Sequence, residues 1–253
     1  MRIFSILSGF LLAGAVAAQN TSSQNSSCLP QSSDAEVVRY AWALQSLLEK
    51  YYTSQPLNRT FLSDATNGSR AEYYQNIQGI QRQNRLGVRA VQQLGSITPG
   101  YSNPSCNFSH PNATDGEDYV KNALQLEASV ASALIGAAGY TQSPEVSFLL
   151  SRLAAEHTAG ATWLGAHQRG VVFPTNSTSL VPAYNPEYVL GSGNQAGRLG
   201  RYLHGCVEAP SSPSGKPFFI GPLVGSVGNQ TSATVGASSS ASISPTARAR
   251  RVF

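Results

Sequence analysis

Apolar residues recur at helical spacing through residues 34–168, and this periodicity constrains the fold more than any other feature of the chain. Local start and stop signals divide the stretch into four helical segments. They are 35–55 after a capping Asp34, about 70–94 before Gly95, about 115–139 beginning at Asp115, and 145–170 after Ser143–Pro144. About twenty residues separate the second and third segments, and the other connections are short. The sequence therefore predicts an all-α four-helix bundle with one long connection.

The first residues of the chain predict export. An early arginine precedes a short apolar run that ends in small residues, with cleavage expected before Gln19, as is typical of a secretory signal peptide. The run is too short for a transmembrane span, and we predict none. Eight N-x-Ser/Thr sequons agree with export: Asn20, Asn25, Asn58, Asn67, Asn107, Asn112, Asn176 and Asn229. We expect a glycosylated protein that is secreted, either extracellular or in the cell wall.

Composition divides the chain into five parts. Residues 1–18 form the signal, and 19–33 form an Asn/Ser-rich leader that we expect to be disordered and glycosylated. Residues 34–168 form the bundle. Residues 169–225 are rich in proline and glycine, which predicts a loop-rich extension packed on the bundle. Residues 226–253 are rich in Ser and Ala, which predicts a disordered tail.

Three cysteines follow the signal, and export favours disulfides among them. Cys106 and Cys206 both lie in loop-like sequence outside the helical segments, so we predict that these two pair. Cys28 lies in the leader and is either free or paired between molecules. The alternative that all three are unpaired stays open.

The net charge of +4 does not predict a nucleic-acid partner. One arginine lies in the signal and three in the last six residues, which leaves 13 basic and 13 acidic residues in the body of the chain. No basic patch with interleaved aromatic residues occurs there. Cell-wall or surface components are the partners that the export signals suggest.

Polar residues interrupt the apolar face of each helical segment. Glu127 has only apolar neighbours at helical offsets, so its carboxylate is expected to point inward, where it needs a partner, a proton or a metal. In the fourth segment Glu156 shares a face with Leu153 and Gly160, with His157 at the edge of that face. Inner positions in the first and second segments hold Gln45 and Gln83, and Glu49 lies one turn after Gln45.

Three stretches carry a resemblance to a known family: "ALQSLLEKYY", "LQLEASVASALIGAAGYTQSPEV" and "LLSRLAAEHTAGATWL". They resemble the ferritin-like domain of secreted fungal stress-response proteins, which are related to plant desiccation-associated proteins. The resemblance covers residues 34–168 and extends loosely through "YLHGCVEAPSSPSGKPF". It implies a four-helix bundle. In metal-binding members it also implies a Glu on the first and third helices and Glu-x-x-His on the second and fourth, around two irons.

The ligand pattern that the resemblance implies is only partly present. Its positions fall on Gln45 in the first helix, Gln83 and Leu86 in the second, Glu127 in the third, and Glu156 and Ala159 in the fourth. A neutral amide does not replace the charge of a carboxylate, and two irons need about four carboxylates with imidazoles. The resemblance therefore predicts the fold but a degraded ligand set.

Two hypotheses follow for function. In the first, the inner acids are hydrogen-bonded to groups such as Gln45, Gln83, Arg82 or Arg85, no cofactor is bound, and the protein is non-catalytic with a stress-related or surface-binding role. In the second, a divalent ion (iron, manganese or zinc) is bound in a metal-binding protein or oxidase. The candidate ligands are Glu49, Glu127, Glu156 and His157, with Gln45 and Gln83 as weak oxygen ligands.

Overall fold

The computed structural model describes residues 28–168, 172, 181–213 and 215 of the chain, and this part contains helices and no strands. The signal 1–18, the first part of the leader and the tail 226–253 lie outside the described residues. Four long helices form the bundle that the periodicity predicts: α1 (Ala35–Tyr52), α3 (Tyr73–Ile97), α4 (Gly116–Ala137) and α5 (Pro144–Gln168). The shorter elements are η1 (Ser32–Asp34), α2 (Arg59–Leu62), η2 (Ala138–Tyr140), α6 (Pro186–Leu190) and α7 (Gly200–Leu203).

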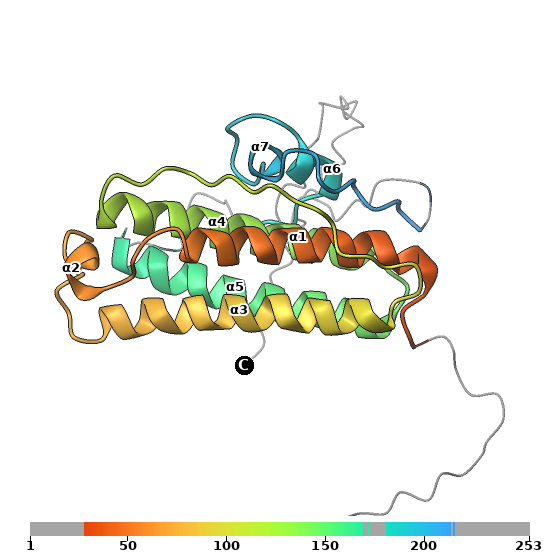
Figure 1. Ribbon diagram of the computed structural model, residues 1–253, viewed down its shortest axis with the longest axis horizontal. Coiled ribbons are helices and arrows are strands. Elements are labelled where there is room, and N and C mark those ends of the chain that lie inside the picture. The colour runs from red at the N-terminus through yellow and green to blue at the C-terminus, as the bar shows by residue number, and fades with distance from the viewer. Residues whose placement is uncertain (1–27, 169–171, 173–180, 214, 216–253) are drawn as a thin grey trace, which may run out of the picture.

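The connection between α3 and α4 determines the topology (Figure 1). It runs along the length of the bundle, so that α4 begins at the same end as α3 and the two helices are parallel. The pairs α1 with α3 and α4 with α5 are antiparallel and closely packed. The four-helix bundle and the long α3–α4 connection are therefore confirmed. The expectation that the other connections are short was wrong for the link from α1 to α3, which spans residues 53–72 and contains α2.

Local signals explain most helix ends. The Asp115 carboxylate accepts a hydrogen bond from the Asp118 N–H at 2.8 Å, and this caps α4 as predicted. Pro144 opens α5, with the Ser143 hydroxyl accepting from the Val146 N–H. Asp34 was expected to cap α1. Its carboxylate instead accepts from the Gln31 N–H and the Thr141 hydroxyl, and it joins η1 to the turn after α4.

The second helical segment does not stop at Gly95, because α3 continues to Ile97. A Cβ at Gly95 would lie 2.3 Å from the ring of Tyr101, so the glycine makes room for the connection that follows the helix. Here tertiary packing, rather than a helix stop, accounts for the glycine.

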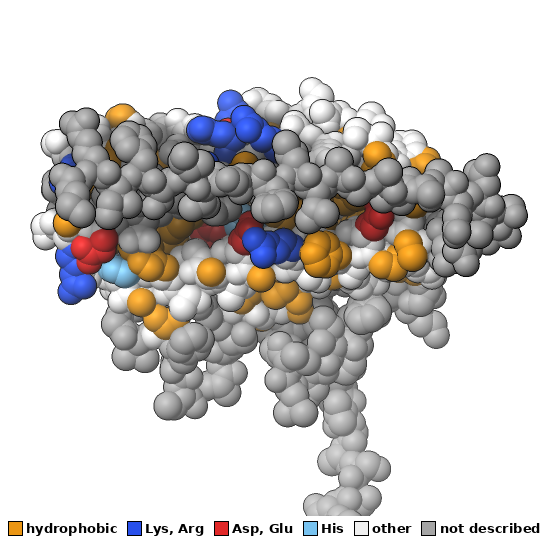
Figure 2. Space-filling view, turned by 90° about the horizontal axis from the view of Figure 1, so that it is seen from below, with side chains coloured by type: hydrophobic (Ala, Val, Ile, Leu, Met, Phe, Trp, Pro, Cys, Tyr) orange, Lys and Arg blue, Asp and Glu red, His pale blue; other side chains and the backbone are white. Residues whose placement is uncertain are grey.

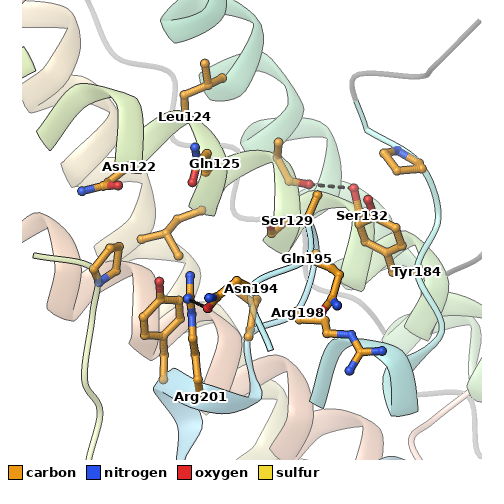
Figure 3. A pocket seen from close by; sticks show the side chains of 18 residues that line it. Asn122, Leu124, Gln125, Ser129, Ser132, Tyr184, Asn194, Gln195, Arg198 and Arg201 are labelled. Atoms are coloured by element: carbon orange, nitrogen blue, oxygen red, sulfur yellow. Dashed lines mark hydrogen bonds between the residues drawn. The ribbon is translucent and has the colours of Figure 1, made fainter. Parts of the chain in front are cut away.

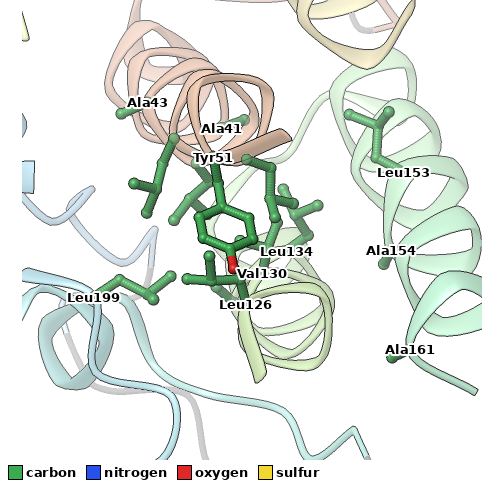
Figure 4. Packing of buried hydrophobic residues seen from close by; sticks show 14 of the residues in the cluster. Ala41, Ala43, Tyr51, Leu126, Val130, Leu134, Leu153, Ala154, Ala161 and Leu199 are labelled. Atoms are coloured by element: carbon green, nitrogen blue, oxygen red, sulfur yellow. The ribbon is translucent and has the colours of Figure 1, made fainter. Parts of the chain in front are cut away.

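Small and aromatic residues fill the core together. Figure 4 shows the Tyr51 ring pointing from α1 towards Leu126 and Val130 of α4. Its hydroxyl donates to the Tyr119 carbonyl at 2.7 Å, and the two tyrosine rings stack with centroids 4.8 Å apart. The buried tyrosine therefore has both apolar contacts and a hydrogen-bond acceptor, as a buried phenol requires.

The described part of the extension packs on α4 and α1. Leu199 and Leu203 are buried in the same apolar cluster as the bundle residues, and Figure 4 shows Leu199 approaching from the side opposite α5. The Tyr184 N–H donates to the Ser132 carbonyl of α4 at 3.0 Å. A Cβ at Gly136 would lie 1.7 Å from the Tyr184 carbonyl oxygen, so this close approach requires glycine.

One disulfide joins the long connection to the extension. Cys106 and Cys206 are bonded with an S–S distance of 1.98 Å, which confirms the predicted pairing. Cys28 is exposed and has no disulfide partner.

On the face seen from the α3 and α5 side, the described residues present mostly hydrophobic and other uncharged side chains, with charged side chains among them (Figure 2). No helix in the described ranges has the length and apolar character needed to cross a membrane.

Candidate functional site: a polar layer in the bundle core

Each long helix contributes one buried polar side chain to the same level of the bundle. Gln45 comes from α1, Asn84 from α3, Glu127 from α4 and His157 from α5, and none is more than 4% exposed. Apolar residues flank them along each helix. We call these four residues the polar layer.

The Glu127 carboxylate is the centre of the polar layer. Its Oε2 lies 2.6 Å from His157 Nδ1, and its Oε1 accepts from the Asn84 side-chain amide at 2.9 Å. Because a carboxylate only accepts hydrogen bonds, Nδ1 of the imidazole carries the hydrogen. The other imidazole nitrogen, Nε2, is hydrogen-bonded to the Gln45 amide nitrogen. A single hydrogen-bonded chain therefore crosses the bundle from α1 through α5 and α4 to α3.

One glycine provides space for these side chains. Gly87 follows Asn84 by three residues, and a Cβ there would lie 2.2 Å from Gln45 Oε1. Any larger side chain at Gly87 would displace Gln45. Gly160 follows His157 by three residues, but a Cβ there would make an ordinary contact of 3.4 Å with the Glu127 carboxylate. The layer therefore requires glycine at position 87 and not at position 160.

Tyr52 borders the polar layer from α1. Its side chain is fully buried, and burial followed by the charge of Glu127 raises the pKa of Tyr52 well above its usual value. Tyr52 is thus a neutral phenol beside the carboxylate. Gln45 Oε1 and Asn84 Oδ1 are buried acceptors without a hydrogen-bond partner among the described residues.

Two of the predicted ligands lie outside the layer. Glu49 forms an ion pair with Arg85, 3.8 Å apart, and Glu156 forms one with Arg152 at 2.9 Å. All four of these side chains are at least a quarter exposed. The structure therefore brings Glu127 and His157 together and holds Glu49 and Glu156 in ion pairs at the surface.

The predicted inner faces of α3 and α5 were wrong by one residue. His157 is buried and Glu156 is at the edge, the reverse of the prediction, and Gln83 is exposed while Asn84 is buried. Adjacent helix residues point about 100° apart, so a rotation of the helix by roughly half that angle exchanges which of the two lies nearer the core. A signal for Asn84 was present, because it lies seven residues from both Ile77 and Val91 of the apolar face.

A pocket gives access to the polar layer between α3 and α5. Its volume is about 440 Å³, and Asn84, Glu127 and His157 lie at its inner end. Arg152 and Trp163 line it closer to the surface. The Glu127–His157 pair is thus buried but has a route to solvent.

The donor set of the polar layer does not fit a dinuclear metal centre. It offers one carboxylate and two neutral amides, and the one imidazole already bonds the carboxylate and Gln45 through its two nitrogens. Two metal cations in a bundle of this kind need about four carboxylates with imidazoles. Within the described ranges, no three His, Cys, Asp or Glu side chains lie close enough to share a metal ion.

The described sequons differ in their surroundings. Asn58, Asn107 and Asn112 are exposed. Asn67 is half-buried at a positive φ of 64°, and its side-chain amide donates to the His167 carbonyl at 3.0 Å. Asn20, Asn25, Asn176 and Asn229 lie outside the described residues.

Comparison with known proteins gives one match. The family model described as a ferritin-like domain matches residues 33–168, which is more than half of the chain and coincides with the bundle. Comparisons with curated proteins and with solved structures found no match.

Proposed function

This chain belongs to the ferritin-like domain family, and we propose from that premise that it is a secreted, glycosylated and non-catalytic member of it. Its role is stress-related or is binding at the cell surface or wall. The observation that supports this is the polar layer, where hydrogen bonds between side chains replace a metal-ligand set. The bundle thus keeps its fold without the donor set of a dinuclear centre.

The polar layer is suited to a structural role. A buried carboxylate that lacked donors would be costly, and here His157 and Asn84 supply them. Each of the four helices contributes one member, so the hydrogen bonds form together only when the helices have the correct rotation and height. In the proposed function, the layer specifies the packing of the bundle.

The sequence features of export support the secreted part of the proposal. The signal-like first 18 residues and the sequons stand beside a disulfide, which persists in oxidising compartments. Asn58, Asn107 and Asn112 are exposed and open to glycan attachment.

The alternative, a divalent ion held by Glu49, Glu127, Glu156 and His157, is not favoured. The Glu49 and Glu156 carboxylates face arginines at the surface. Recruiting them to an ion in the core would require both ion pairs to break and both side chains to lose solvent.

Elemental analysis tests the proposal. The chain is expressed through a secretory host, and iron, manganese and zinc are measured before and after mild chelation. We expect far less than one metal ion per chain and an unchanged melting temperature on chelation. Stoichiometric metal that is lost in Glu127→Ala would overturn the non-catalytic assignment in favour of the metal-binding alternative, and its loss in Glu156→Ala as well would add Glu156 to the ligands.

Two further measurements test export. Sequencing of the mature chain is expected to begin at Gln19, and enzymatic removal of N-linked glycans is expected to lower its mass. A chain that stays inside the host, or that carries no glycan, would contradict this part of the proposal.

A further inference from the structure

A second pocket lies on the other side of α4, between that helix and the extension. Its volume is about 320 Å³, within the range of small-ligand sites. In Figure 3, Asn122 and Gln125 of α4 lie on one side of it, and Asn194 and Arg201 of the extension lie on the other. Its walls therefore come from segments that are far apart in the sequence.

The two walls of this pocket are held in fixed positions. The Cys106–Cys206 disulfide joins the extension to the long connection, and the Tyr184 N–H bonds the Ser132 carbonyl of α4. The Ser109 N–H donates to the Tyr202 carbonyl at 3.1 Å. A ligand that binds between these walls meets a preformed site and does not have to order it.

The charged side chains that line the pocket are all basic. Arg198 and Arg201 line it, and none of its lining residues is acidic. Arg198 lies over the Tyr188 ring at 4.9 Å and Arg201 over the Tyr202 ring at 4.4 Å. Each also donates to one neutral oxygen, of Ser192 and Asn194 respectively. Among the described residues neither forms an ion pair, so the pocket favours an anion.

Of the two arginines, Arg201 is the one that faces the α4 wall. In Figure 3 its side chain extends past Asn194 towards the side where Gln125 lies, whereas the Arg198 side chain is directed away from both. A carboxylate between the two walls would therefore meet Arg201.

The remaining lining groups favour a ligand with several hydroxyls. Side-chain amides line the pocket on both walls, and they belong to Asn122, Gln125, Asn194 and Gln195. The Ser129 hydroxyl also lines it. An amide both donates and accepts, as a sugar hydroxyl does. We propose that this pocket binds a sugar acid of the hexuronate class, with its carboxylate at Arg201 and its hydroxyls at the amides. This names a ligand class for the binding role proposed above, on which it rests.

Calorimetric titration of the full glycosylated chain at low salt tests the proposal, with galacturonate, glucuronate, galactose and inorganic phosphate as probes. We expect the uronates to bind about tenfold or more tightly than galactose, because only they offer a carboxylate to Arg201. We expect them to exceed phosphate by a similar factor, because phosphate lacks the hydroxyl pattern that the amides match. Higher salt should weaken uronate binding.

Variants locate the site. Arg201→Gln is expected to weaken galacturonate binding by about tenfold or more, because it removes the positive charge that pairs with the carboxylate. Arg201 is exposed, so the change leaves the core of the bundle intact. Gln125→Ala is expected to weaken it by a smaller factor. Arg89→Gln, an exposed arginine on α3, is the matched control and should leave binding unchanged. Asn112→Gln removes the sequon beside the pocket and should also leave binding unchanged.

Equal binding of galacturonate and galactose, equal binding of phosphate, or an unaffected Arg201→Gln variant would overturn the proposal. Failure of the sugar-acid proposal can be distinguished from failure of the proposed function. A metal-free chain that binds no uronate contradicts the sugar-acid site alone. Stoichiometric metal that depends on Glu127 contradicts the non-catalytic assignment alone. It does not affect the uronate titration, because the polar layer lies on the other side of α4 from this pocket.

Discussion

Glu127 is the residue on which the interior of this bundle depends most. Its carboxylate is 1% exposed and receives one donor from α5 and one from α3. Removing a buried member of such a network leaves its partners unpaired in a medium of low polarity. Glu156, 29 residues on in the chain, is an equally charged residue in a solvated ion pair. The two glutamates therefore form a natural comparison.

We predict that Glu127→Ala destabilises the protein by about 3–5 kcal/mol, because His157 and Asn84 lose their acceptor. Glu156→Ala should cost less than about 1 kcal/mol, since it breaks only an exposed ion pair. Urea unfolding followed by circular dichroism measures both. Similar losses for the two variants would contradict the buried position of Glu127 and the edge position of Glu156.

Gly87 gives a second prediction at this scale. Gly87→Ala places a methyl group against Gln45 and should destabilise the protein by about 1–3 kcal/mol through overpacking. Gly79→Ala on the same helix is the control, because nothing lies within 4 Å of a Cβ there. That change should stabilise the helix by about 0.5–1 kcal/mol. If both variants shift the urea midpoint in the same direction, the close contact at Gly87 is refuted.

Glycan occupancy should differ among the described sequons. The Asn67 amide donates to the His167 carbonyl and lies half-buried, so a glycan there has to replace a tertiary contact. We predict lower occupancy at Asn67 than at Asn58, Asn107 and Asn112, measured by glycopeptide mass spectrometry of the secreted chain. Full occupancy at Asn67 would show that glycan transfer precedes or overrides this contact.

At the scale of elements, the extension is the part that depends most on a covalent bond. Its helices α6 and α7 are short, with five and four residues, and cannot be stable alone. Packing of Leu199 and Leu203 on the bundle and the bond from Cys206 to Cys106 hold it in place. Because that bond closes a loop of 100 residues, it restricts the unfolded chain considerably.

We predict that replacing both Cys106 and Cys206 by serine lowers stability by about 2–5 kcal/mol. Cys28→Ser should change it by less than about 0.5 kcal/mol, because Cys28 is exposed and unpaired. Thermal unfolding of the three proteins under non-reducing conditions gives the comparison. A large effect of Cys28→Ser would instead indicate that Cys28 forms a bond in solution.

For the molecule as a whole, buried tyrosines link stability to high pH. Burial is the largest cause that raises the pKa of Tyr73 to about 12, and burial raises the pKa values of Tyr40, Tyr51, Tyr52 and Tyr119 further. Above their usual value of 10, these phenols stay protonated in the folded chain and ionise in the unfolded one. The folded state then binds more protons, so stability falls as the pH rises.

We predict constant tyrosine-linked stability below about pH 10 and a decline above it, of up to about 1.4 kcal/mol per pH unit for each such tyrosine. The urea midpoint measured across this range gives the slope. Tyr40→Phe keeps the buried ring and removes a hydroxyl that has no partner among the described residues, so its decline should be less steep. An unchanged slope in that variant would contradict a buried phenol at position 40.

The sequence by itself determined the helices, their order and much of the core. Apolar spacing, caps such as Asp115 and the proline at 144 are local signals, and they act within one or two turns. Glu127 and Gln45 were identified as inward-facing because each lies near the middle of an apolar stripe. The cysteine pairing followed from their positions in loops outside the helices.

Only the tertiary structure decided which residues at the edges of those stripes face the core. His157 is buried in place of Glu156, and Asn84 in place of Gln83, because of how each helix is rotated against its neighbours. The spacing of apolar residues along one helix predicts that rotation only to within about one residue. The pocket between α4 and the extension likewise joins Gln125 to Arg201, residues far apart in the chain. Such proximity arises from packing between elements, so it cannot be predicted from the local sequence around either residue.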